Sequence, residues 1–316
     1  MRIFITGTAG FIGYHLSRFL LSKGFFVYGI DNLNNYYDLK LKHARLIELE
    51  KFKNFSFMAQ DLNEISKKEL NCDIALNLAA QAGVRLPKED NWKYDYSNVN
   101  GFESFLKFCE FNDINKIIYA SSSSVYSGNK EIPFSEECLL SKPSSRYAET
   151  KIINENQADK YINNSPNTRI IGLRFFTVYG PWGRPDMAYY LFSEKVINKS
   201  LIKLFNDGKT SRDMTNIEDI VTGIYLSMKH LEKSKKRHEI FNLGNSKPVK
   251  TSELLNIIEE KLKIEAKVMM VQNQNEPMIT KADITKSKNI LGYNPQISIN
   301  EGLEDFFCWY KKYNNV

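Results

Sequence analysis

The chain has 316 residues, of which 42% are hydrophobic and 25% are charged, and its formal net charge is +6 at pH 7. This length and composition are typical of one large or two ordinary globular domains and exclude a disordered or fibrous protein. No run of about 18 apolar residues occurs, so we expect no membrane span. The N-terminus also lacks the apolar centre of a signal peptide, so we expect a cytoplasmic protein.

The composition argues against several kinds of site. The four cysteines (Cys72, Cys109, Cys138 and Cys308) form no CxxC pair, as expected for reduced thiols in the cytosol. The histidines form no HxH or HExxH cluster, so we predict no metal site. Lysines alternate with acidic residues along the chain instead of clustering with aromatic ones. We therefore expect no nucleic-acid partner.

The first half of the chain alternates short apolar segments with helical patterns, as βαβ units do. The expected strands cover residues 3–5, 25–30, 55–58, 74–78, 117–120 and 170–174. The expected helices cover residues 12–23, 39–50, 98–111 and 147–163. The strands are apolar on both faces, which is typical of parallel strands covered by helices. We predict an α/β fold with a Rossmann-type, doubly wound parallel sheet in residues 1–175.

The pattern loosens after residue 174, where residues 180–185 (GPWGRP) interrupt it. We interpret residues 176–316 as mostly a smaller C-terminal α/β domain that binds substrate over the carboxyl ends of the strands, where ligands bind in such sheets. Two segments, near 216–230 and 241–243, are candidates for returning to the first domain.

A glycine-rich turn joins the first strand to the first helix. Gly7, Gly10 and Gly13 allow a pyrophosphate to approach the helix N-terminus, whose free N–H groups favour an anion. Asp31 ends the second strand 18 residues after Gly13, where a carboxylate can accept hydrogen bonds from an adenosine ribose. The next residue is Asn32, and no arginine follows to receive a 2′-phosphate, so the pattern favours NAD over NADP.

A tyrosine and a lysine, Tyr147 and Lys151, lie four residues apart on one face of an expected helix. The lysine ammonium and the nicotinamide charge should lower the tyrosine pKa towards neutrality, so that the phenolate acts as a general base. Ser122 lies in a serine run (residues 121–124) after the fifth apolar segment, where a hydroxyl can relay a proton between tyrosine and substrate.

Together these features resemble the extended short-chain dehydrogenase/reductase family, in its branch that modifies nucleotide sugars. In that resemblance Ser122, Tyr147 and Lys151 match the catalytic residues. The 4,6-dehydratases of the family have an Asp-Glu pair where this chain has Ser123 and Ser124, which disfavours water elimination.

Several stretches carry a closer resemblance. They are residues 31–38 (DNLNNYYD), 79–85 (AAQAGVR), 120–126 (ASSSSVY), 174–188 (RFFTVYGPWGRPDMA), 211–220 (SRDMTNIEDI), 242–245 (NLGN) and 291–295 (LGYNP). They are similar to UDP-glucuronate 4-epimerases. The resemblance implies an NAD-dependent isomerase that interconverts UDP-glucuronate and UDP-galacturonate for surface polysaccharide synthesis.

The resemblance also implies site residues and an assembly. The cofactor, a tightly bound NAD, is expected to contact Gly7, Gly10, Phe11, Ile12, Gly13, Asp31, Asn32, Asp61, Leu62, Leu78, Ala79, Ala80, Asn98, Tyr147 and Lys151. The catalytic residues are Tyr147, Lys151, Ser122 and Ser124, and the substrate is expected to contact Arg85, Ser122, Ser124, Thr177, Arg184, Arg212 and Asp283. Among these, Arg184 and Thr177 with Ser124 would orient the sugar carboxylate. A homodimer through residues 98–111 and 147–163 is expected.

Three alternatives stay open on sequence alone. The first is an NAD-dependent C4 oxidoreductase, either an epimerase or a net dehydrogenase, that acts on another UDP- or GDP-sugar. The second is a decarboxylase. The third is a non-catalytic, NAD-sensing or RNA-binding member of the fold, because a fold does not by itself determine function.

Overall fold

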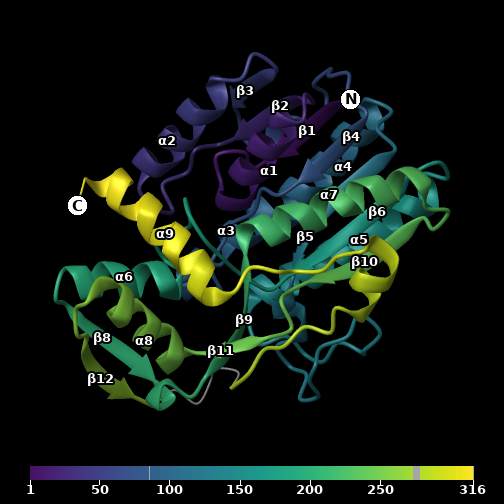
Figure 1. Ribbon diagram of the computed structural model, residues 1–316. Helices are drawn as coiled ribbons and strands as arrows, with labels where there is room; N and C mark the ends of the chain where they lie inside the picture. Colours follow the sequence, from purple (N-terminus) through teal and green to yellow (C-terminus); the bar gives the residue numbers. More distant parts are fainter. Residues whose placement is uncertain (85, 273–277, 316) are drawn as a thin grey trace.

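The computed structural model describes residues 1–84, 86–272 and 278–315 (Figure 1). Its main sheet has seven strands in the order β10-β6-β5-β4-β1-β2-β3, and every neighbouring pair is parallel. The strands are β1 (Arg2–Thr6), β2 (Phe26–Asp31), β3 (Phe55–Ala59), β4 (Ile74–Asn77), β5 (Lys116–Ser122), β6 (Arg169–Phe175) and β10 (His238–Leu243). The order reverses between β1 and β4, which confirms the predicted doubly wound fold.

Helices cover both faces of this sheet (Figure 1). The helices α1 (Phe11–Ser22) and α7 (Ile217–Lys233) share one apolar core with the sheet. The helices α4 (Gly101–Phe111) and α5 (Arg146–Asn164) pack on the opposite face. The predicted 98–111 helix is longer than expected, because helical backbone starts at α3 (Trp92–Tyr94) and passes through a π-helical turn, η3 (Asp95–Asn100).

The C-terminal half also contributes a smaller lobe with its own apolar core (Figure 1). Its helices are α6 (Ala188–Ile197), α8 (Thr251–Leu262) and α9 (Ile299–Asn314). The remaining long helix, α2 (Leu39–Glu50), lies in the first half of the chain between β2 and β3. The strands β7 (Thr177–Tyr179), β9 (Ser211–Asn216) and β11 (Pro248–Lys250) form one small sheet, and β8 (Leu201–Phe205) pairs with β12 (Lys267–Val271). Short helical turns complete the chain: η1 (Leu62–Glu64), η2 (Lys88–Asp90), η4 (Ser123–Tyr126), η5 (Asn206–Gly208) and η6 (Ser287–Leu291).

The two segments singled out in the second half lie in α7 and β10, which are part of the main sheet and its cover. The division into residues 1–175 and 176–316 stays a prediction. None of the helices in the described ranges combines the length and apolar character needed to cross a membrane.

A buried ion pair joins α5 to the main sheet. The guanidinium of Arg174 on β6 donates two hydrogen bonds to the carboxylate of Glu155 on α5, at 2.8 and 2.7 Å. Ser121 on β5 donates to the same carboxylate at 2.6 Å, and Arg174 also donates to the hydroxyl of Tyr126 at 2.7 Å. Both charged side chains are less than a tenth exposed, so each depends on the other for compensation of its charge.

Removing one partner of this pair should therefore destabilise the fold. We expect Glu155→Leu to lower the free energy of unfolding by about 3–5 kcal/mol, because the Arg174 charge then stays buried without a counter-charge. The double variant Glu155→Leu/Arg174→Met should recover most of that loss, as measured by urea unfolding. A double variant no more stable than the single one would contradict this account.

Candidate active site

The glycine-rich turn after β1 packs directly on the backbone after β4. Gly7 has a φ of +71°, and a Cβ there would lie 2.8 Å from the amide nitrogen of Ala79. A Cβ on Gly13 would lie 2.1 Å from the carbonyl oxygen of Gly7. The hydroxyl of Thr6 accepts hydrogen bonds from the amides of Leu78 and Ala79 at 3.2 and 3.0 Å. Only glycine fits these contacts, and they fix where α1 begins.

The edge built by this turn fits a dinucleotide. The first turn of α1 has no side-chain cap at Gly10, so its N–H groups are available to a diphosphate. Asp31 ends β2, and its carboxylate accepts from the amide of Leu33 at 2.8 Å and from the ammonium of Lys42 at 3.4 Å. A carboxylate held in this way can accept hydrogen bonds from a ribose diol.

A cleft runs along the carboxyl ends of the main strands, and its volume is about 1320 Å³. That exceeds the roughly 300–1,000 Å³ of a pocket for one drug-sized ligand, so it has room for a dinucleotide and a nucleotide sugar. Most of the predicted site residues line it: Gly7, Gly10, Phe11, Ile12, Gly13, Asp31, Asn32, Asp61, Leu62, Leu78, Ala79, Ala80, Ser122, Ser124, Tyr147, Lys151, Thr177, Arg184 and Arg212.

Two predicted residues of the described structure, Asn98 and Asp283, do not line this cleft. Asn98 is 2% exposed, and its amide side chain accepts from the backbone N–H of Gln81 at 2.7 Å and donates to Thr150 at 3.1 Å. It therefore supports the segment after β4 from behind. Asp283 caps its own turn by accepting from the amide of Thr285 at 2.9 Å. Arg85 lies outside the described residues.

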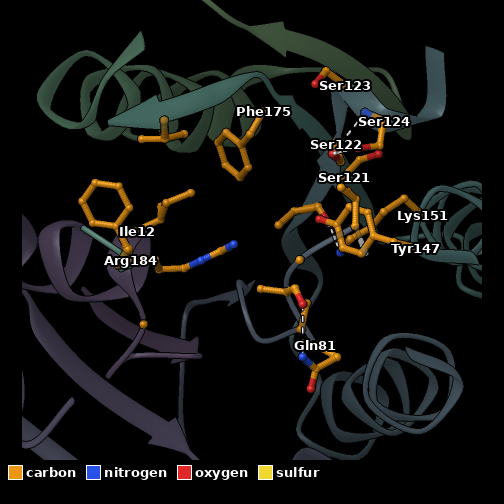
Figure 2. Close-up of a pocket in the computed structure, with 18 of the residues that line it drawn as sticks. Ile12, Gln81, Ser121, Ser122, Ser123, Ser124, Tyr147, Lys151, Phe175 and Arg184 are labelled. Atoms are coloured by element: carbon orange, nitrogen blue, oxygen red, sulfur yellow. Dashed lines mark hydrogen bonds between the residues drawn. The ribbon is translucent and has the colours of Figure 1, made fainter. Parts of the chain in front are cut away.

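The predicted catalytic groups meet on one wall of the cleft. Figure 2 shows Tyr147 and Lys151 of α5 beside Ser122 at the end of β5. The Lys151 ammonium donates to the carbonyl of Ala120 at 2.9 Å and lies 5.8 Å from the centre of the Tyr147 ring. The hydroxyl of Ser122 donates to that of Ser124 at 3.2 Å. The hydrogen bond to the carbonyl of Ala120 fixes the Lys151 ammonium near the Tyr147 ring.

The pKa of the tyrosine differs from our expectation. Burial raises the pKa of Tyr147 above its ordinary value, and the opposing influences are a hydrogen bond with Ser122 and the charge of Arg184. Burial also lowers the pKa of Lys151 to about 8, against the effect of Glu155. Without the nucleotide, the Lys151 ammonium therefore does not lower the pKa of Tyr147 below its ordinary value. The reason is that burial disfavours both the phenolate of Tyr147 and the ammonium of Lys151.

Arg184 reaches into the cleft from the wall opposite Tyr147 (Figure 2). Its Nε and Nη2 donate to the two carboxylate oxygens of Asp186 at 2.9 and 2.7 Å. The hydroxyl of Tyr36 donates to the same carboxylate at 3.1 Å. Within the described residues Nη1 of Arg184 has no hydrogen-bond partner, so the guanidinium is held along one edge and keeps one nitrogen for a ligand.

Sequence reasoning missed several residues that line the cleft. Asp186 and Tyr36 stand inside the stretches 174–188 and 31–38, but nothing in their spacing indicates that they meet. The side chain of Lys42 is 5% exposed and pairs with Asp31. The only sequence signal for this pair is that Asp31 follows an expected strand and Lys42 lies in the next expected helix. The cleft is also lined by Gln81, Phe175, Met187 and Thr280.

The lysine should reduce the stability of the folded chain. Because burial lowers the pKa of Lys151 from 10.5 to about 8, the unfolded chain binds the lysine proton between those pH values and the folded chain does not. Below pH 8 the lysine therefore destabilises the fold, and Lys151→Met in nucleotide-free protein should be more stable at pH 7 by on the order of 2 kcal/mol. Urea unfolding should show this gain shrinking as the pH rises towards 10; a gain that is constant with pH would contradict it.

Comparisons with known proteins agree with this geometry. Residues 3–244 match the model of the NAD dependent epimerase/dehydratase family. The chain is 43% identical over 316 residues to the uncharacterized protein MJ1055 of Methanocaldococcus jannaschii, with 98% of this chain and 95% of that protein covered. It is 41% identical over 332 residues to UDP-glucuronate 4-epimerase 4 of Arabidopsis thaliana, with 98% and 75% covered.

A solved structure is similar over the whole chain. The crystal structure of UDP-glucuronic acid 4-epimerase from Bacillus cereus in complex with UDP-glucuronic acid and NAD superposes with a TM-score of 0.91. It is 32% identical in sequence, and the match covers 99% of this chain and 100% of that one. With the glycine-rich turn and the Ser122, Tyr147 and Lys151 set in place, the chain belongs to the NAD dependent epimerase/dehydratase family, within the extended short-chain dehydrogenases/reductases.

Proposed function

We propose that this protein is an NAD-dependent nucleotide-sugar epimerase that interconverts UDP-glucuronate and UDP-galacturonate at C4. One observation carries the proposal. A guanidinium, Arg184, faces Tyr147 and Ser122 across a cleft that is large enough for both ligands. The end-to-end similarity to UDP-glucuronic acid 4-epimerases supports the same substrate.

The cofactor is held, in this proposal, by the glycine-rich turn and Asp31. Bound NAD accepts a hydride from C4 of the sugar and returns it, so the reaction has no net oxidation and the cofactor stays in place. Asp31 accepts from the adenosine ribose, and the free N–H groups of α1 bind the diphosphate. Asn98 supports the segment after β4 that lies against the cofactor.

Tyr147 exchanges the proton of the sugar 4-hydroxyl. Its phenolate oxygen takes this proton as the hydride leaves C4, which gives a 4-ketosugar, and returns it when the hydride comes back to the opposite face of C4. Ser122 and Ser124 hydrogen-bond the 4-oxygen in both steps. Lys151, fixed by the carbonyl of Ala120, holds its charge near the tyrosine ring and favours the phenolate.

The carboxylate of the sugar needs a partner of its own. The 4-ketouronate is a β-keto acid, so it can lose CO₂ when its C–CO₂ bond turns perpendicular to the ketone plane. The electron pair of that bond then forms an enolate, which takes a proton to give a 4-ketopentose, and return of the hydride to C4 would reduce it to a pentose. Arg184, with Thr177 and Ser124, holds the carboxylate away from that orientation. Arg212, which lines the cleft, serves the nucleotide side.

The setting of the enzyme is also part of the proposal. We infer a homodimer through α4 and α5, because Phe111 at the end of α4 is 50% exposed, and Trp92 and Tyr96 on the helical segment before α4 are 58% and 40% exposed. Large exposed aromatic side chains of this kind are typical of interfaces. Light scattering should then give about twice the chain mass of 36.6 kDa.

The four free thiols agree with a cytoplasmic location, and an activated uronic acid is a suitable donor for surface polysaccharide synthesis.

The substrate is tested by proton NMR. Purified protein given UDP-glucuronate without added cofactor should convert it to a stable mixture with UDP-galacturonate, because the bound NAD is regenerated in each turnover. A UDP-pentose as the main product would instead indicate a decarboxylase. An unchanged spectrum would overturn the uronate assignment, and other UDP- and GDP-sugars would then be tried.

The base is tested by removing one oxygen atom. Tyr147→Phe should lower kcat by roughly 10²–10⁴-fold, because the 4-hydroxyl proton then has no acceptor at this position. Tyr225→Phe is the matched control, since Tyr225 lies on α7 and packs on the ring of Phe19 at 5.2 Å, away from the cleft. If the two variants have the same activity, Tyr147 is not the base.

A further inference from the structure

The loop that leads into Arg184 is held by side chains at every carbonyl. The four carbonyl oxygens of residues 180–183 each accept a side-chain hydrogen bond. The carbonyl of residue 180 accepts from the hydroxyl of Tyr189 at 3.1 Å, and the carbonyl of residue 181 accepts from Nε2 of His15 at 2.9 Å. The carbonyls of Trp182 and Gly183 both accept from Nη2 of Arg45, the latter at 3.2 Å. Each peptide carbonyl of the loop is therefore held by a hydrogen bond from a side chain of another segment or of α6.

The shape of this loop needs such support. Trp182 has a φ of +59°, in the left-handed region that a residue with a side chain rarely adopts. A Cβ on Gly183 would lie 1.6 Å from the hydroxyl of Tyr189, so the backbone runs against this side chain. Burial lowers the pKa of His15 to about 3, which keeps its ring neutral at ordinary pH and leaves Nε2 as the donor to the carbonyl.

Arg45 connects this loop to the cofactor side of the cleft. Its side chain is fully buried on α2, and its Nη1 donates to the carbonyl of Ala9 and to the hydroxyl of Tyr37, each at 2.7 Å. Ala9 lies inside the glycine-rich turn. One guanidinium thus bridges the turn that would receive the cofactor and the loop that precedes Arg184.

The Arg45 guanidinium is buried, and the groups that accept from it are neutral carbonyl and hydroxyl oxygens. No carboxylate of the described residues forms an ion pair with it, and its Nε is buried without a hydrogen-bond partner. Burying a cation in this way is costly, so a purely structural cross-link would be better made by a neutral side chain. The retained charge suits a position behind the turn that binds a diphosphate.

We propose that Arg45 is a positioning residue that fixes the 180–183 loop against the glycine-rich turn and so sets the place of the Arg184 guanidinium at the sugar carboxylate. The inference rests on the proposed function, in which Arg184 controls the fate of the 4-ketouronate. A small displacement of a group that orients a reacting bond is enough to change the outcome of a reaction. Arg45 thus influences which product forms, although it does not contact the sugar.

The test uses the holoenzyme and four variants, the fourth of which is Arg184→Ala. Arg45→Met removes the donors and keeps the length of the stem, and Arg45→Lys keeps the charge with fewer donors. Arg169→Met is the matched control, because Arg169 also donates to two backbone carbonyls, of Glu232 and Ser234, at 3.2 and 3.1 Å, and lies outside the cleft. Hydrogen exchange of residues 180–188 and the ratio of UDP-pentose to UDP-galacturonate are measured for each, with the unfolding midpoint.

We expect Arg45→Met to raise the exchange rate of residues 180–188 and to raise the UDP-pentose ratio by roughly tenfold to a hundredfold. Arg45→Lys should lie between this variant and the unchanged protein. Arg169→Met should leave both readouts unchanged even where it lowers the unfolding midpoint, which separates positioning from a general loss of stability.

The outcome for Arg184→Ala separates this inference from the proposed function. If Arg184→Ala raises the UDP-pentose ratio and Arg45→Met does not, Arg45 does not position Arg184 and the inference is wrong. If Arg184→Ala leaves the ratio unchanged, the carboxylate role of Arg184 fails, and the exchange of residues 180–188 alone decides whether Arg45 holds the loop. Exchange in Arg45→Met equal to that of the unchanged protein overturns the inference in either case.

Discussion

The cleft depends on one contact between two pieces of backbone. The turn after β1 lies so close to the segment after β4 that Gly7 leaves no room for a Cβ beside Ala79, and Gly13 leaves none beside the carbonyl of Gly7. This contact lies where the strand order reverses, so it brings the start of α1 and the ends of β4 and β5 to one edge. A side chain at either glycine would push α1 away from the sheet. The diphosphate site and the serine at the end of β5 would then no longer face the same space.

Around that edge the molecule buries charge in fixed places. Glu155 compensates Arg174 behind the sheet and acts on Lys151 four residues earlier on α5, so the structural ion pair also influences the pKa of this lysine. Lys151 is held by a backbone carbonyl, and Arg184 is held along one edge by Asp186. Each of these charges is oriented before substrate binds. Such preorganisation reduces the rearrangement that the reaction itself requires, which is how enzymes gain most from polar groups in a dry site.

Local patterns predicted much of this architecture. The apolar segments, the three glycines and the i,i+4 pair of Tyr147 and Lys151 each reflect a geometry within one turn or one element, so the sequence alone was sufficient for the sheet and for most of the lining of the cleft. Contacts between distant segments were not predictable in this way. Arg45 meets residues 182 and 183 across 137 and 138 positions, and Asp186 meets Tyr36 across 150. Burial raises the pKa of Tyr147 in the chain without nucleotide, and the sequence did not indicate this because burial follows from tertiary packing and not from the lysine spacing.

In the proposed reaction a hydride leaves C4 of the sugar and returns to the same carbon inside one site. UDP-glucuronate carrying deuterium at C4 tests this most directly, with the position and amount of label in the product followed by NMR and mass spectrometry. The product should be UDP-galacturonate that keeps the whole label at C4, with none gained by NAD added to the solution. Loss of the label to solvent or to added NAD would contradict an internal, redox-neutral transfer.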